Sequence, residues 1–125
     1  MSRLIWGEPD GIPEGSNFDL MAELTINGVR DTTLEGGTYV MSLREAGNST
    51  AANILTDTVS SSNDSSRPFY TVKWSIEDSI SNGWAVSGLD SALTAVTYNG
   101  DIRGTLADGR VLYWGVALKM RQVLD

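Results

Sequence analysis

The stretch TAVTYNGDIRGTLADGRVLYWGVALKMRQV, residues 94–123, carries the clearest fold signal in the chain. Asn99-Gly100 is a preferred dipeptide of the two-residue type I′ turn, because both central residues of that turn need φ > 0. Residues 107–110 (ADGR) suit a slightly longer turn with Gly109 in the left-handed conformation. The sequence therefore predicts three short strands joined by two tight turns.

After the second turn, apolar residues occupy every other position of the final segment. Such period-two alternation indicates a strand with one buried face. The opposite face carries Tyr113, Lys119 and Arg121, and we expect it to meet either solvent or another protein. The inward positions are Leu112, Trp114, Val116, Leu118 and Met120.

Shorter segments upstream repeat this pattern of strand and turn. Asn27-Gly28 is a second type I′ dipeptide, and residues 60–67 form a polar, low-complexity loop. Residues 91–98 combine helical spacing with β-branched side chains, and we favour a strand there. Many short strands separated by turns are typical of an antiparallel sandwich or a small barrel, and we favour the sandwich. The other expected strands are residues 17–26, 38–43, 54–59 and 68–76, followed by a turn or one turn of helix over 77–83.

Composition narrows the classes of function. A chain of 125 residues forms one domain and needs no covalent staple. It has no cysteine, which excludes disulfides and thiolate metal sites, and no histidine, the commonest general base and metal ligand. The net charge of −7 argues against a nucleic-acid surface. Because neither a signal-peptide core nor a bilayer-spanning stretch is visible, we expect a cytosolic product that inserts in no membrane.

Residues 1–16 are predicted to form an extended N-terminal arm, and residues 17–125 the β-sandwich domain. The segment GEPDGIPEG places two prolines and three glycines within nine residues, which favours irregular, extended chain. Trp6 either covers the core of its own domain or anchors in a partner subunit. The residues expected to contact a partner are Leu4, Ile5, Trp6, Ile12, Pro13 and Tyr113.

Catalysis has few candidate residues. Ser-His-Asp and Cys-His arrangements are impossible without histidine and cysteine, and no Walker-type loop occurs. A glycosidase can work with two carboxylates, but the acidic residues lie in expected turns and on solvent faces. We therefore interpret them as solvating charges, with Asp101 and Asp108 as turn formers, and expect no enzyme. The carboxylates considered are Glu23, Glu77, Asp78 and Asp101.

Ligand binding has two further candidates. Asp57, Asn63 and Asp64 supply oxygen atoms for calcium, but their spacing departs from the EF-hand loop, so we predict neither metal nor cofactor. Exposed aromatic rings would form a carbohydrate-binding platform, whereas buried rings would belong to the core. The aromatic candidates are Trp84, Tyr98 and Tyr113.

Two segments carry a resemblance to a known family: YTVKWSIEDSISNGW (70–84) and GDIRGTLADGRVLYW (100–114). In the first segment a strand is followed by the acidic residues Glu77 and Asp78 and by the pair Gly83-Trp84. The second segment is a hairpin that contains Asp101-Ile102 and Asp108-Gly109. This order resembles the small immunoglobulin-like β-sandwich modules of tailed bacteriophages, such as the N-terminal module of phage baseplate upper proteins. Over residues 17–123 the matching positions are Trp74, Glu77, Asp78, Gly83, Trp84, Asp101, Ile102, Asp108 and Gly109.

The resemblance implies an all-β, antiparallel immunoglobulin-like sandwich with a structural role in a virion. Further domains follow this module in baseplate proteins, whereas this sequence ends at Asp125. We therefore expect a separately added subunit, namely a capsid decoration or cement protein, assembled in the host cytoplasm. Its partners would be the major capsid protein, tail proteins or a second copy of itself. A tail or baseplate component and a carbohydrate-binding module are the alternatives.

Overall fold

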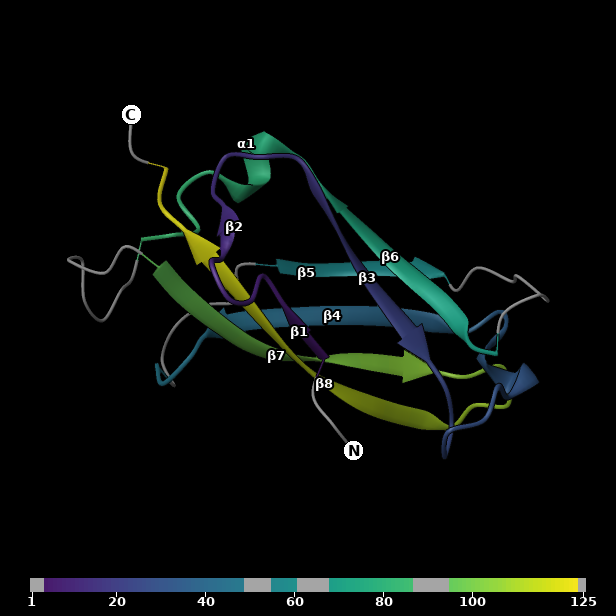
Figure 1. Ribbon diagram of the computed structural model, residues 1–125. Helices are drawn as coiled ribbons and strands as arrows, with labels where there is room; N and C mark the ends of the chain where they lie inside the picture. Colours follow the sequence, from purple (N-terminus) through teal and green to yellow (C-terminus); the bar gives the residue numbers. More distant parts are fainter. Residues whose placement is uncertain (1–3, 49–54, 61–67, 87–94, 124–125) are drawn as a thin grey trace.

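The computed structural model describes residues 4–48, 55–60, 68–86 and 95–123, which fold mainly into β-strands (Figure 1). This confirms the all-β prediction. Two short helices, η1 (Thr32–Leu34) and α1 (Asp78–Ser81), lie in the connections. In chain order the strands are β1 (Leu4–Trp6), β2 (Ile12–Pro13), β3 (Phe18–Leu24), β4 (Thr38–Glu45), β5 (Leu55–Ser60), β6 (Tyr70–Ile76), β7 (Ala95–Thr105) and β8 (Val111–Arg121).

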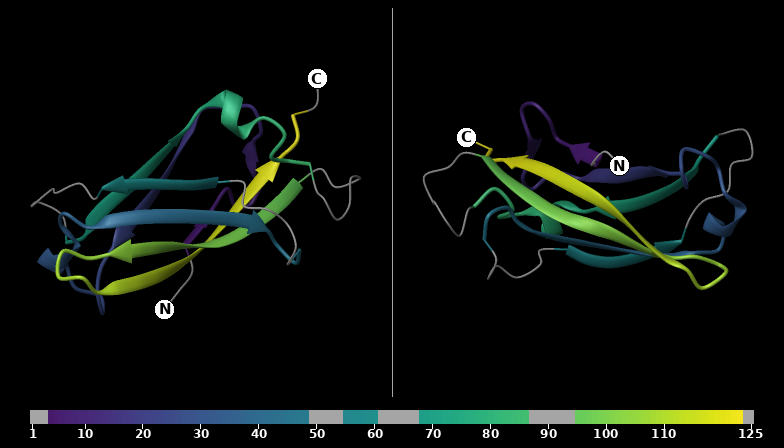
Figure 2. Two further views of the ribbon diagram at one scale, coloured as in Figure 1. Left: turned by 180° about the vertical axis from the view of Figure 1, so that it is seen from behind. Right: turned by 90° about the horizontal axis from the view of Figure 1, so that it is seen from below.

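The strands form two sheets. The large sheet has the order β1-β8-β7-β4-β5, with β2 also paired to β8, and the small sheet consists of β3 and β6. Every described pair of strands within residues 17–125 is antiparallel, as predicted. The predicted arm contributes two strands, β1 and β2, that run parallel to β8 and make the large sheet mixed. Figure 2 shows the small sheet lying across one face of the large sheet, and no described segment crosses the other face.

The core fills the space between the two sheets. Strand β3 buries Leu20, Ala22 and Leu24 and turns the residues between them outward, as the alternating pattern of residues 17–26 predicts. Strand β6 does the same within residues 68–76, and β4 and β5 lie within or close to their expected ranges. The remaining core side chains are Tyr39, Met41, Leu43, Tyr70, Val72, Trp74, Ile76, Val96, Tyr98, Ile102, Trp114, Val116, Leu118 and Met120.

The predicted turn at Asn99-Gly100 is wrong, because β7 continues through this dipeptide without interruption. Strand β7 is paired on both sides, with β4 and with β8, so backbone pairing on two edges holds these residues extended. A Cβ atom added to Gly100 would overlap the carbonyl oxygen of Ser42 on β4. Glycine here allows two backbones to approach closely. Residues 94–123 accordingly form two long strands and one turn within the described part.

Two other predicted turns are confirmed. Asn27 and Gly28 have φ angles of 52° and 77°, and the backbone N–H groups of Ile26 and Val29 donate to each other's carbonyl oxygens at 2.9 and 3.0 Å. In the turn between β7 and β8, Gly109 has a φ of 91°. The Leu106 N–H donates to the Arg110 carbonyl oxygen at 2.8 Å and closes this hairpin.

The N-terminal arm belongs to the large sheet of its own chain. Strands β1 and β2 extend the edge of β8, and Leu4, Trp6 and Ile12 pack partly buried against the core. The Trp6 indole N–H donates to the Met21 carbonyl oxygen on β3 at 3.1 Å. The arm therefore bridges the side of the molecule between β8 and β3, and Trp6 covers its own core, the first of the two alternatives.

Candidate functional site

The outer face of the large sheet gathers cationic side chains from β4, β7 and β8. Arg103 lies directly across from Tyr113, Arg44 is paired with Asn99, and Lys119 and Arg121 occupy alternate positions near the end of β8. Alternate residues of these strands point into the core, so the residues in between share the outer side. We call this surface the basic face, made up of Ile5, Val40, Arg44, Asp101, Arg103, Tyr113, Lys119 and Arg121.

The charge of the basic face is opposite to that of the whole chain. It holds four of the nine Lys and Arg residues of the chain but only one, Asp101, of the sixteen Asp and Glu residues. Arg103 and Arg121 are exposed. Lys119 Nζ donates to the Pro9 carbonyl oxygen at 2.5 Å, which ties the arm to this edge of the sheet. A chain with a net charge of −7 thus presents one cationic surface.

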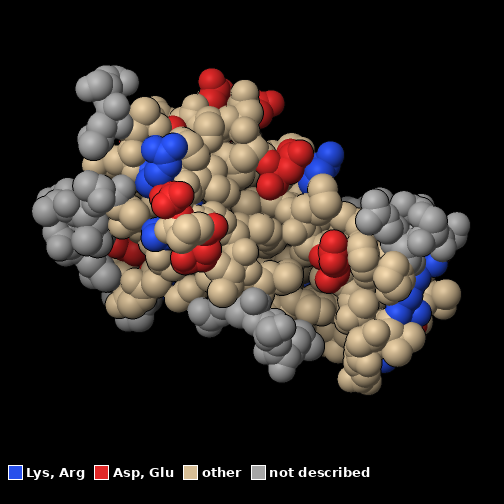
Figure 3. All heavy atoms as spheres, viewed as in Figure 1, with Lys and Arg blue, Asp and Glu red and all other residues tan. Residues whose placement is uncertain are grey.

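The outer face of the small sheet has a different chemistry. Asp19, Met21 and Glu23 point outward from β3, and Lys73 lies opposite Met21 on β6. Figure 3 shows acidic and basic side chains interspersed over this side of the molecule, which also carries the arm. At these outward positions the small sheet carries two acidic side chains and one basic one, whereas the basic face carries one acidic side chain and four basic ones.

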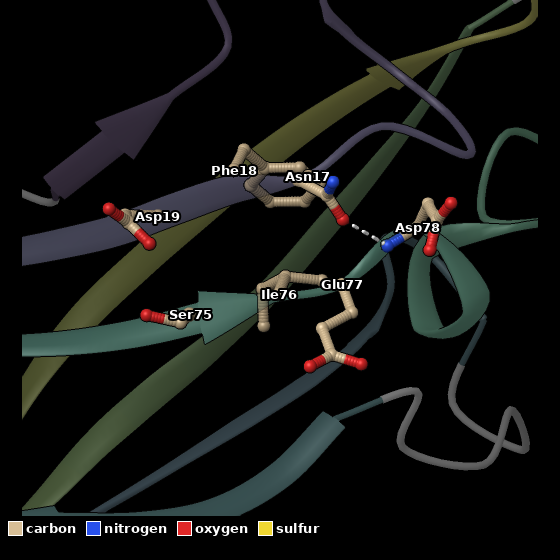
Figure 4. Close-up of a pocket in the computed structure, with 7 residues that line it drawn as sticks. All are labelled: Asn17, Phe18, Asp19, Ser75, Ile76, Glu77 and Asp78. Atoms are coloured by element: carbon tan, nitrogen blue, oxygen red, sulfur yellow. Dashed lines mark hydrogen bonds between the residues drawn. The ribbon is translucent and has the colours of Figure 1, made fainter.

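A shallow, open pocket of about 550 Å³ lies where β3 begins and β6 ends (Figure 4). The Asp78 N–H donates to Asn17 Oδ1 at 2.7 Å across it, and the Phe18 ring packs edge-to-face against Trp84 with centroids 6.3 Å apart. Figure 4 shows the carboxylates of Asp19, Glu77 and Asp78 spaced around the rim without converging. The complete lining is Asn17, Phe18, Asp19, Ser75, Ile76, Glu77 and Asp78.

The structure separates the carboxylates considered for catalysis. Glu77 and Asp78 share the pocket, Glu23 lies on the outer face of the small sheet, and Asp101 lies on the basic face. Within residues 4–48, 55–60, 68–86 and 95–123, acidic side chains form no group of three that could hold a metal ion. Of the calcium candidates, Asn63 and Asp64 lie outside the described residues.

The two aspartates expected in turns have different positions. The interpretation of Asp101 as a turn former is wrong, because it sits inside β7. Asp108 is a turn former: its Oδ1 accepts from the Arg110 N–H at 3.0 Å. That backbone hydrogen bond, helped by the Arg110 guanidinium at 2.7 Å, lowers the pKa of Asp108. The pKa of Asp31 is lowered in the same way, mainly by the Thr33 N–H.

Two of the three aromatic candidates for a carbohydrate platform lie in the core. Trp84 and Tyr98 are 6% and 4% exposed, and the Tyr98 hydroxyl donates to the Trp84 carbonyl oxygen at 2.7 Å. Burial raises the pKa of Tyr98. A platform formed by either ring is therefore excluded, because stacking needs an open face. Tyr113 is exposed, on the basic face.

The six residues expected to contact a partner divide into two groups. Leu4, Trp6, Ile12 and Pro13 are partly buried in their own sheet, whereas Ile5 and Tyr113 are each 58% exposed. Both exposed residues belong to the basic face. Their contact with a partner stays a prediction, but the structure brings them onto one surface with the cations. The alternation of residues 111–121 predicted the outward residues of β8 on this surface. No pattern in the sequence indicated that Arg44 on β4 would join them.

Comparison with known proteins gives no further guide, since no family model, curated protein or solved structure matches the chain. No helix among the described residues is long and apolar enough to cross a membrane.

Proposed function

We propose that this protein is a non-catalytic structural subunit of a tailed-phage virion, built on an immunoglobulin-like sandwich. It docks on neighbouring virion proteins, and its leading role is that of a capsid decoration protein. The observation that supports the proposal is the strand order, because it agrees with the order of strands in immunoglobulin domains, the fold that the resemblance implies.

In immunoglobulin domains of the variable type, strands G, F, C and C′ are neighbours in one sheet and strands B and E are neighbours in the other. Here β8, β7, β4 and β5 follow one another in the large sheet, and β3 pairs with β6 in the small one. Chain order agrees as well, since β3, β4, β5, β6, β7 and β8 would be B, C, C′, E, F and G.

Tyr98 provides a second point of agreement. Immunoglobulin-like domains carry a tyrosine near the start of strand F whose hydroxyl binds the backbone of the preceding connection. Tyr98 is the fourth residue of β7, and its hydroxyl binds the Trp84 carbonyl oxygen between β6 and β7. Two residues later, where the disulfide-bonded domains have a cysteine, this chain has Gly100, which lies against β4. The hydrogen bond reaches back 14 residues, farther than the few that are usual.

The distribution of exposed side chains favours docking through a sheet face. The arm is paired with β8 of its own chain, so strands β1 and β2 are not free to extend over a neighbouring subunit. The basic face instead offers a flat surface with two exposed apolar residues, Ile5 and Tyr113. Interfaces of this kind combine aromatic anchors and Arg with a polar surround.

Particle association tests the proposal. Particles of the phage that encodes this chain are banded on a density gradient and probed with an antibody against the protein. We expect it in the band of intact particles, with immunogold label on the capsid. Label on the tail would replace the decoration role by a tail or baseplate role. Absence from particles, together with retention on a glycan resin, would overturn the structural proposal in favour of a carbohydrate-binding module.

A further inference from the structure

We propose that the basic face is a docking surface for a flat, acidic protein surface. The inference rests on the proposed function in one respect, the expectation that the acidic partner is a virion protein. The charge and exposure of the basic face are properties of this chain alone. Arg103 and Arg121 are exposed, and neither guanidinium group forms a hydrogen bond or ion pair with any residue that the structure describes. Their charges are thus available to an incoming partner.

The side chains in the centre of the basic face are short, and the long charged side chains lie toward its ends. In the middle of the sheet, next to Asp101 and Asn99, Gly115 has no side chain and those of Ala117 and Ser42 are small. Longer side chains lie on either side: Arg103 and Tyr113 toward one end, and Lys119 and Arg44 toward the other. The view from behind in Figure 2 shows no described segment over this sheet. A flat partner can therefore lie across the strands and meet cations at both ends.

The positive charge of the basic face determines which kind of partner can bind there. A second copy in a symmetric dimer would bring the same cations together, and like charges that face each other are unfavourable. Opposite potentials attract, steer encounter and set orientation. An acidic surface satisfies this condition, while Tyr113 and Ile5 supply the apolar contact that interfaces usually contain.

Nucleic acid and membrane surfaces fit the face less well. Duplex DNA carries one charge about every 1.7 Å, and tight binders typically neutralise several phosphates with as many cations. Here four cations share the face with Asp101, within a chain of net charge −7 that repels a polyanion of that density. An anionic membrane would need a denser basic cluster as well. A protein surface of moderate acidity avoids both costs.

A labelled acidic polymer tests the face without the virion. Fluorescein-labelled poly-L-glutamate is titrated with the protein at low salt, and anisotropy reports binding. The double variant Arg103→Glu/Arg121→Glu should bind on the order of tenfold more weakly, because each reversed charge changes the affinity severalfold. The control is Lys73→Glu, on an exposed residue of the other sheet, which changes the net charge by the same amount as each single variant, Arg103→Glu or Arg121→Glu. The control should bind within about twofold of the wild type, whereas each single variant should bind about threefold more weakly. Amide NMR shifts on titration should map to β7 and β8.

Three results would overturn the inference. The first is a loss in Lys73→Glu equal to that in the single variants Arg103→Glu and Arg121→Glu, since net charge alone would then explain binding. The second is no binding of poly-L-glutamate combined with tight binding of duplex DNA or phosphatidylserine vesicles through Arg103 and Arg121. The third is undiminished loading of the double variant onto phage particles, which contradicts a docking role. A protein absent from particles that still binds poly-L-glutamate through this face would refute the virion role and leave the inference standing.

Discussion

The dipeptide Asn-Gly has opposite roles at residues 27–28 and 99–100. At Asn27-Gly28 both residues have positive φ and the chain reverses between β3 and β4. At Asn99-Gly100 the chain is extended in the middle of β7 and paired on both sides. A third copy, Asn82-Gly83, has positive φ at the glycine alone, after α1. The dipeptide permits a tight turn, but the neighbouring strands decide whether one forms.

The reason for the glycine also differs between the two sites. A Cβ atom at Gly28 would meet no atom within 4 Å, so its requirement is a backbone angle of 77°. A Cβ atom at Gly100 would strike the backbone of β4, so its requirement is space. Substitutions that add one methyl group separate these two requirements.

The largest effect is expected for Gly100→Ala. The new methyl group meets the Ser42 carbonyl on a central strand, where no flexible side chain can move aside. We expect the free energy of unfolding to fall by about 3 kcal/mol or more. Urea denaturation followed by circular dichroism measures the loss. A change below that of Gly28→Ala would show that β4 and β7 are farther apart than the structure places them.

The second effect is that of Gly28→Ala. Open space surrounds the added methyl group, but alanine disfavours a φ of 77°. We expect a loss of about 1 kcal/mol in the same assay, the usual cost of a non-glycine residue in the left-handed region. A neutral result would mean that the turn can change its type without cost.

A smaller effect is expected for Asn99→Thr. Threonine suits an extended, doubly paired strand, so the free energy of unfolding should change by no more than about 0.5 kcal/mol. The same substitution at Asn27 introduces a β-branched residue at a φ of 52° and should cost about 1 kcal/mol. Thermal melts of both variants measure the contrast. Equal losses at the two sites would contradict the different roles of the two asparagines.

The smallest effect concerns the turn that does join β7 to β8. The pKa of Asp108 lies below its ordinary value of 3.8 because the charged carboxylate accepts from Arg110. A depressed pKa adds stability above the ordinary pKa, and this stability is lost as the pH falls through the folded value. Asp108→Asn should therefore melt slightly below the wild type at pH 7, with the difference vanishing toward pH 2. A difference in melting temperature independent of pH would show that the charge plays no part.

Local pattern was sufficient for much of the fold. Alternation in residues 17–26 and 111–121 predicted β3 and β8, because one wet and one buried face impose a period of two. Local pattern gave a wrong prediction at Asn99-Gly100, because the glycine there allows two strands to pack closely and does not form a turn. Gly104 is a second example: an added Cβ would lie 2.8 Å from the Trp114 ring and 2.9 Å from the Tyr39 ring. Neither ring is near Gly104 in sequence, so no local pattern could reveal this contact.

The candidate site was predictable only in part. Tyr113, Lys119 and Arg121 were placed on one outward face from the alternation of a single strand. Arg44 joins them through the pairing of β4 with β7, and Ile5 through the parallel pairing of β1 with β8. Partners far apart in the chain leave no local trace, because cross-strand pairing is set by the assembled sheets.

By itself, the sequence determined that this is an all-β chain, where most strands lie, and which of their faces are apolar. These properties follow from the period of two along each strand and from turn residues, which act on the chain immediately around them. Tertiary structure alone decided that Asn99-Gly100 lies within a strand, that the arm joins its own sheet, and that cations from three strands share one face. Each of these depends on which backbones lie side by side, and that choice is made by the packed core as a whole.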